Sequence, residues 1–201
     1  MRNMSIGIAG VFLVTLFIVP AQAGEEVTAS KSLTVQPTGP RAGDAGKKYF
    51  NMQGKDSGKY ASFGVLVFET PKETKASKIK GMTLTLVQSV PAFAKDGAVK
   101  IYVAPELDPA ADLKFDAKSD NGIGDQIKVL NELCSGTFKK MKTGETQSFS
   151  LTLDDAWKER ISNGARLCLV IVPADLTVAA TYFGANEDDK PNSPKLTMDV
   201  P

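Results

Sequence analysis

The sequence predicts an all-β fold, an antiparallel β-sandwich with one short helix. Three observations support it. Roughly nine short strand-like runs follow one another along the chain. Turn-forming glycine, proline, asparagine and aspartate separate these runs. Only one stretch carries the start signal, the helix-forming residues and the stop signal of a helix. Many short strands with turns between them are typical of two packed sheets.

The strand-like runs, in chain order, are residues 32–35, 48–52, 61–68, 81–88, 98–104, 146–153, 165–172, 178–183 and 195–200. Residues 81–88 alternate, so Met82, Leu84 and Leu86 should face a core while Thr83 and Thr85 face solvent. Two other runs repeat the alternation, with these side chains inward: Val99, Ile101, Val103, Phe149, Leu151 and Leu153. Residues 165–172 are almost continuously apolar, which predicts a central strand.

The segments between these runs are mostly loops. Residues 154–161 predict the one helix, because Asp154 can cap its first turn and Asn163–Gly164 can end it. Within this helix we expect Trp157 to pack on the core. Residues 36–48 are rich in proline and glycine and predict a loop. Residues 124–133 fit either a short helix or a strand.

Composition limits the function. The chain has 201 residues, with 24 Lys+Arg, 23 Asp+Glu and no His. The near-zero charge argues against nucleic acid or an anionic membrane as the main partner. Without histidine, Ser-His-Asp and Cys-His catalysis are excluded and a zinc centre is disfavoured. We therefore expect no catalytic residue and no enzyme. A carboxylate pair such as Asp154 and Asp155 is the one remaining route to a hydrolase.

The first 23 residues have the pattern of a signal peptide. Arg2 supplies the positive start, residues 6–19 are mostly apolar, and Pro20 precedes the small-residue cleavage site Ala21-Gln22-Ala23. The apolar stretch is shorter than the roughly 20 residues that a membrane-spanning helix needs. The sequence therefore predicts cleavage before Gly24 and export to the periplasm or the cell exterior without a membrane anchor. Residues 24–31 would then form a lead-in to a single domain, residues 32–201.

Export bears on the two cysteines, Cys134 and Cys168. In an oxidising compartment a lone pair of cysteines commonly forms a disulfide. Both residues lie in strand-like segments, and only some cross-strand geometries allow the bond. Two buried free thiols are the alternative.

One loop has the oxygen ligands that calcium prefers. Asp116, Asp120, Asn121 and Asp125 fall within ten residues, with Gly122 and Gly124 to bend the chain. The spacing differs from that of an EF-hand. These four residues are the candidate ligands of a structural Ca²⁺, and a surface loop without metal is the alternative. We expect no other cofactor.

Aromatic side chains could provide a sugar site, since sugars stack on flat rings beside polar groups. Tyr49 and Tyr60 flank the polar loop 54–59, and Tyr102 lies beside Lys100 on the polar side of its strand. These three tyrosines are the candidate ligand-binding residues.

The order of segments resembles the DNRLRE-type secreted domains, jelly-roll β-sandwiches akin to carbohydrate-binding modules. The stretches that carry the resemblance are residues 63–69, 78–86, 154–157, 163–164, 180–187 and 193–199. The resemblance implies a jelly-roll-like topology over about residues 32 to 200. It also implies a structural calcium ion, which such modules often carry.

These observations favour an exported, non-catalytic protein with a structural or adhesive role in the cell envelope or extracellular matrix. The alternative is a carbohydrate-binding module that acts alone and recognises a polysaccharide. The expected partners are accordingly a polysaccharide or an envelope protein. A sugar site would separate the two functions.

The signal peptide leads to a direct prediction. Mass spectrometry of the native protein purified from its source should find Gly24 as the first residue, because signal peptidase cuts after a small-x-small motif. A native protein that keeps residues 1–23 would contradict the predicted export.

Overall fold

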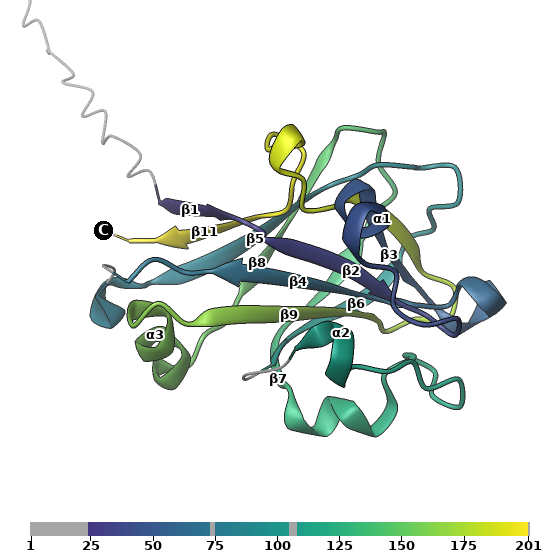
Figure 1. Ribbon diagram of the computed structural model, residues 1–201, viewed down its shortest axis with the longest axis horizontal. Coiled ribbons are helices and arrows are strands. Elements are labelled where there is room, and N and C mark those ends of the chain that lie inside the picture. Colours follow the sequence, from purple (N-terminus) through teal and green to yellow (C-terminus); the bar gives the residue numbers. More distant parts are fainter. Residues whose placement is uncertain (1–23, 73–74, 105–107, 201) are drawn as a thin grey trace, which may run out of the picture.

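The protein is an antiparallel β-sandwich with a few short helices, as the sequence predicted (Figure 1). The computed structural model describes residues 24–72, 75–104 and 108–200. The predicted signal peptide, residues 1–23, lies outside this part of the chain. Within it, no helix has both the length and the apolar character needed to cross a membrane.

Two sheets form the sandwich. One has four strands in the order β1 (Glu25–Thr28), β11 (Lys195–Asp199), β5 (Gly81–Val87) and β8 (Thr146–Leu151). The other has five strands in the order β2 (Lys31–Val35), β4 (Phe63–Glu69), β9 (Arg166–Pro173), β6 (Gly97–Ala104) and β7 (Asn131–Phe138). The pair β3 (Tyr49–Gln53) and β10 (Ala179–Phe183) joins the end of β5 through a bridge between Gln88 and Tyr182.

The main core lies between the two sheets. Met82, Leu84 and Leu86 of β5 point into it, as their alternation predicted. The other predicted inward side chains also belong to this core or pack against it: Val99, Ile101, Val103, Phe149, Leu151 and Leu153. Tyr182 is fully buried there and contacts the rings of Phe50 and Phe138 at centroid distances of 5.4 and 5.9 Å.

The predicted helix is α3 (Asp155–Ser162). The side chain of Asp154 caps it by accepting a 2.8 Å hydrogen bond from the backbone N–H of Trp157. Gly164, with a φ of 76°, follows its end. Trp157 is buried in the main core, as expected.

The prediction of a single helix was wrong, because α1 (Gly43–Lys48) and α2 (Pro109–Asp112) also occur. The first lies inside the predicted loop 36–48. Gly46 lets the turn of α1 approach β2, where a Cβ would collide with the carbonyl oxygen of Ser32. The hydroxyl of Ser32 in turn donates a 2.8 Å hydrogen bond to the Gly46 carbonyl. Packing against β2 thus stabilises α1, although its two glycines disfavour a helix.

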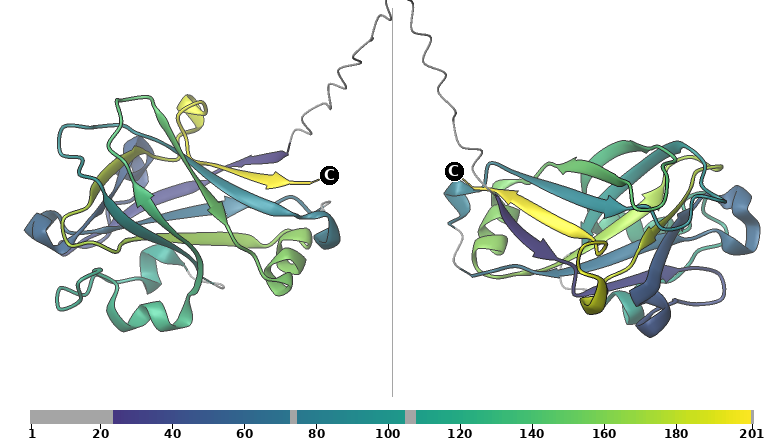
Figure 2. Two further views of the ribbon diagram at one scale, coloured as in Figure 1. Left: turned by 180° about the vertical axis from the view of Figure 1, so that it is seen from behind. Right: turned by 90° about the horizontal axis from the view of Figure 1, so that it is seen from above.

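Two strands carry weak sequence patterns. Strand β1 lies in the expected lead-in and pairs with β11, and Figure 2 (right) shows the two side by side. Strand β7 is an edge strand whose register shifts opposite Ile101 and Tyr102. This shift interrupts the alternation, which explains why the sequence indicated strand-like character around Cys134 but no strand with these bounds. The turn at Gly124–Val129 is a 3₁₀ helix.

The predicted disulfide is absent, and both cysteines are free thiols. Cys134 lies in β7 and Cys168 in β9, and β6 runs between these strands. Strands two positions apart are separated by roughly 10 Å, beyond the Cα distance that a disulfide can bridge. The two side chains also face opposite sides of the sheet, since Cys134 packs on the main core and Cys168 on the outer side.

This arrangement predicts that the unfolded, unreduced protein titrates with two free thiols. Burial raises the pKa of Cys168 to about 12 and also raises the pKa of Cys134. A raised thiol pKa means little thiolate at neutral pH, so alkylation of the native protein should be slow and should accelerate as pH rises. Detection of no free thiol in the unfolded protein would contradict this structure.

Candidate ligand-binding site

The outer face of the five-stranded sheet is itself largely covered. Residues 108–130, here called the covering segment, leave the sheet after β6 and return into β7. Figure 1 shows this segment, including α2, lying below β6 and β9. A second apolar core joins it to the sheet and consists of Leu33, Val35, Phe63, Val65, Tyr102, Ala104, Leu113, Ile123, Leu130, Cys168, Val170 and Val172.

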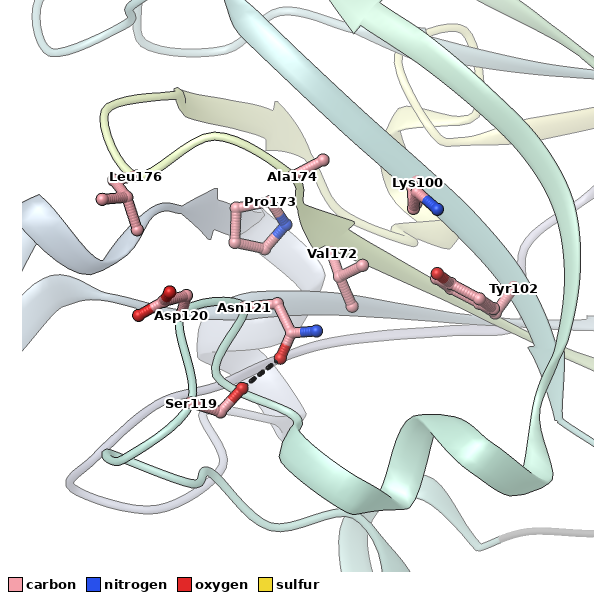
Figure 3. A pocket seen from close by; sticks show the side chains of 9 residues that line it. All are labelled: Lys100, Tyr102, Ser119, Asp120, Asn121, Val172, Pro173, Ala174 and Leu176. Atoms are coloured by element: carbon pink, nitrogen blue, oxygen red, sulfur yellow. Dashed lines mark hydrogen bonds between the residues drawn. The ribbon is translucent and has the colours of Figure 1, made fainter.

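A pocket of about 310 Å³ opens where the covering segment meets β6 and the end of β9 (Figure 3). Its apolar side consists of Val172, Pro173, Ala174 and Leu176. Its polar side consists of Lys100, Tyr102, Ser119, Asp120 and Asn121. An apolar wall with a few polar groups is the common composition of a small-ligand site.

An ion pair and a tyrosine hydroxyl border the pocket on the β6 side. The Lys100 ammonium lies 2.9 Å from a carboxylate oxygen of Glu132, and the Tyr102 hydroxyl donates a 3.1 Å hydrogen bond to the same oxygen. The hydrogen bond from Lys100 lowers the pKa of Glu132, and the same bond raises the pKa of Lys100. Burial, with the charge of Glu132, raises the pKa of Tyr102. Lys100 and Glu132 are therefore both charged, and Tyr102 neutral, at neutral pH.

Asn121 is held in one orientation on the opposite side. Its carbonyl oxygen accepts hydrogen bonds from the Ser119 hydroxyl and from the backbone N–H groups of Ile123 and Gly124. These three donors identify the oxygen end of the amide. The Nδ2 group points toward Val172 and Tyr102 (Figure 3) and has no hydrogen-bond partner in the described part of the chain. Asn121 thus presents a fixed donor to the pocket.

Two residues of the pocket, Asp120 and Leu176, are bound to the loop after β3. Lys55, in the 3₁₀ turn Lys55–Tyr60, forms a 2.7 Å ion pair with Asp120. The backbone N–H of Asp56 donates a 3.0 Å hydrogen bond to the Leu176 carbonyl. A Cβ at Gly54 would collide with the same carbonyl, so glycine permits this close contact. Three segments distant in sequence therefore meet at one rim.

The structure brings together residues that the sequence assigned to different sites. Tyr102, a candidate sugar ligand, and Asp120 and Asn121, candidate calcium ligands, line the same pocket. Tyr49 and Tyr60 are not among its lining residues. Tyr60 is well exposed, and Tyr49 lies beneath the guanidinium of Arg41.

The other pocket residues were not singled out from the sequence. Lys100 and Tyr102 are two positions apart on β6, so the strand pattern already placed them on the same face. Ser119 stands two residues before Asn121 in a turn-rich stretch, which is a weak signal. Nothing local marks Pro173, Ala174 and Leu176 as site residues, because they join the pocket only where β9 passes the covering segment.

The predicted calcium ligands do not converge in this structure. Asp120 pairs with Lys55, Asp125 pairs with Lys128 at 2.8 Å, and Asp116 accepts a 2.9 Å hydrogen bond from the backbone of Lys118. Among the described residues, no group of three or more Asp, Glu or Cys side chains is placed to hold a metal ion. The calcium site stays a prediction that this geometry does not support.

No family model matches the chain, and no curated protein matches it. The resemblance to DNRLRE-type domains therefore stays a resemblance. A solved structure described as "xylan-binding module CBM15" is similar at 13% identity with a TM-score of 0.45, over 88% of this chain and 98% of that one. A xylanase 10C variant from Cellvibrio japonicus in complex with xylopentaose is similar at 15% identity, TM-score 0.42, over 85% of this chain and 27% of that one.

A third structure, titled for the promiscuous specificity of carbohydrate-binding modules of the β-sandwich superfamily, is similar at 10% identity. Its TM-score is 0.28, and the alignment covers 88% of this chain and 54% of that one. The chain thus spans about a quarter of the xylanase and about half of this third structure. Because identities and TM-scores are low, function has to be inferred from this chain's own residues.

The calcium prediction has a specific measurement. If the loop binds Ca²⁺, added Ca²⁺ should raise the melting temperature, because binding to the folded state stabilises it by mass action. Both Asp120→Ala and Asp125→Ala should abolish this rise if the loop closes around the ion. Absence of any calcium-dependent shift in the unaltered protein would remove the prediction.

Proposed function

We propose that this chain is an exported, non-catalytic β-sandwich that binds a saccharide unit of a polysaccharide in the pocket between β6, β9 and the covering segment. One observation carries the proposal: a pocket of about 310 Å³ has an apolar wall on one side and fixed polar groups on the other. A structural or adhesive role in the envelope or matrix, which the sequence favoured, is compatible with such binding, because adhesion to a polysaccharide requires a saccharide site.

The lining suits the two surfaces of a sugar ring. A pyranose has an apolar face of C–H groups and a rim of hydroxyls. Val172, Pro173 and Leu176 offer contact to the apolar face. The Tyr102 hydroxyl and the Asn121 Nδ2 group offer hydrogen bonds to the rim from opposite sides (Figure 3).

The charges of the pocket favour a neutral saccharide. Lys100 is neutralised by Glu132, and Asp120 is neutralised by Lys55. An incoming ion would have to compete with these existing partners, whereas hydroxyl groups can bond to the remaining donors and acceptors. The pocket is thus better suited to a hydroxyl-rich neutral unit than to an acid.

The same charges argue against hydrolysis. A glycosidase needs a carboxylic acid that stays protonated near neutral pH, which requires a raised pKa. The pKa of Glu132 is lowered instead, because Lys100 stabilises its charged form. This supports binding without catalysis.

A hydroxyl deletion tests the pocket. In calorimetric titrations with neutral oligosaccharides selected on a glycan array, Tyr102→Phe should weaken binding about three- to tenfold, the effect of one neutral hydrogen bond. Tyr60→Phe is the matched control, since that hydroxyl lies outside the pocket, and it should leave affinity unchanged. Ala174→Trp should fill the pocket and abolish binding, with the melting temperature checked for each variant.

Two outcomes would overturn the proposal. One is the absence of saturable binding to any neutral saccharide on the array. The other is retention of full affinity by a folded Ala174→Trp variant, which would place the saccharide elsewhere.

A further inference from the structure

We propose that the face of β3 opposite the main core carries a second binding site, formed by Arg41, Tyr49 and Asn51, for a carboxylate or sulfate group on a saccharide. This site is separate from the pocket and does not depend on the pocket's function. It rests on an arginine that is held on an aromatic ring without an acidic partner.

Alternation along β3 creates the site. Phe50 and Met52 are fully buried in the main core, so Tyr49 and Asn51 lie on the other face of the strand. A backbone bridge brings in the third residue. Arg41 and Thr34 exchange hydrogen bonds of 2.7 and 3.0 Å, which places Arg41 beside β2 and next to β3.

The side chain of Arg41 is positioned over Tyr49. Its guanidinium carbon lies 4.4 Å from the centroid of the Tyr49 ring, a favourable cation–π distance. One Nη group lies 3.4 Å from the Thr34 hydroxyl, a long hydrogen bond. These two contacts restrain the guanidinium but occupy only one of its N–H groups. A restrained guanidinium with free N–H groups can bind a carboxylate or a sulfate through paired hydrogen bonds.

Arg41 lacks the partner that a restrained arginine commonly has. Among the described residues it forms no ion pair. Its Nε group is buried without a hydrogen-bond partner. The nearest acid in sequence, Asp44, is almost fully exposed and faces Lys47 at 3.9 Å. A buried donor left unpaired carries a desolvation cost, and the guanidinium as a whole has no carboxylate to balance its charge.

Asn51 supplies a complementary unpaired group. Its Oδ1 atom is buried and has no hydrogen-bond partner, while its backbone N–H donates a 2.9 Å bond to the Thr34 hydroxyl. The Thr34 hydroxyl therefore contacts both the Arg41 guanidinium and the Asn51 backbone, which brings the two residues close together. The site combines a charged donor with a neutral acceptor, as an acidic sugar with free hydroxyls requires.

The ligand class follows from these three groups. A guanidinium fork binds a carboxylate or a sulfate through paired hydrogen bonds. Tyr49 keeps 36% of its surface exposed for contact with sugar C–H groups. Lys48, the last residue of α1, precedes Tyr49 in the chain and adds a positive charge.

The two sites lie on opposite sides of the five-stranded sheet. On β2, Ser32 and Thr34 point toward α1 and β3, whereas Leu33 and Val35 pack under the covering segment. Figure 1 shows α1 and α2 on opposite sides of that sheet. A single chain could therefore hold a neutral unit on one side and an acidic group on the other.

Calorimetric titration with three matched probes tests the second site. The probes are a galacturonic acid tetrasaccharide, the same tetrasaccharide with methyl-esterified carboxylates, and a sulfated neutral tetrasaccharide. At least one anionic probe should bind, at least tenfold more tightly than the ester, and the response of the two anions distinguishes carboxylate from sulfate. Arg41→Lys should weaken the binding at least tenfold, since it keeps the charge but loses the fork.

Arg160→Gln is the matched control, because Arg160 also lies over an aromatic ring, that of Trp157, at 5.1 Å. It should leave affinity for the anionic probes unchanged. Equal binding of the ester and the acid, full affinity in a folded Arg41→Lys variant, or binding of neither anion would overturn the proposal. Failure here leaves neutral binding in the pocket intact, so the two proposals fail separately.

Discussion

The rest of the structure depends on one constraint, which is that the central strands β4 and β9 must be buried on both faces. Leu66, Phe68, Leu169 and Ile171 pack on the main core, and Phe63, Val65, Val170 and Val172 form the opposite face. Each such side chain contributes roughly 1.5–3 kcal/mol when it is removed from water. One opposing sheet can cover only one face, so a third layer is needed. The covering segment supplies it.

The candidate site is a consequence of how that third layer ends. The covering segment packs through Leu113, Ile123 and Leu130 but stops short of the ends of β6 and β9. There Lys100 and the hydroxyl end of Tyr102 line a pocket together with the polar residues Ser119, Asp120 and Asn121. The hydrogen bonds that fix Asn121 serve the turn of the covering segment and also aim its Nδ2 group. The same residues therefore serve the stability of the turn and the proposed ligand site.

Charge pairing distinguishes the two proposed sites. In the pocket, Lys100 and Asp120 each have a partner of opposite charge, so little electrostatic attraction remains for an ion. On β3, Arg41 has an aromatic ring in place of a carboxylate. The protein has almost no net charge, so any preference for an acidic ligand must come from a local arrangement of this kind and not from the field of the whole molecule.

By itself the sequence determined the β-sandwich, most of its strands and the inward side chains, because alternation and turn residues act within a few neighbours. It also identified Tyr102, Asp120 and Asn121 as polar residues of interest. It could not show that they share one pocket, or that Cys134 and Cys168 face opposite sides of a sheet. It also missed α1, which packing against β2 stabilises. Those features depend on strand order and on the path of residues 108–130, and both are decided by contacts between segments far apart in the chain.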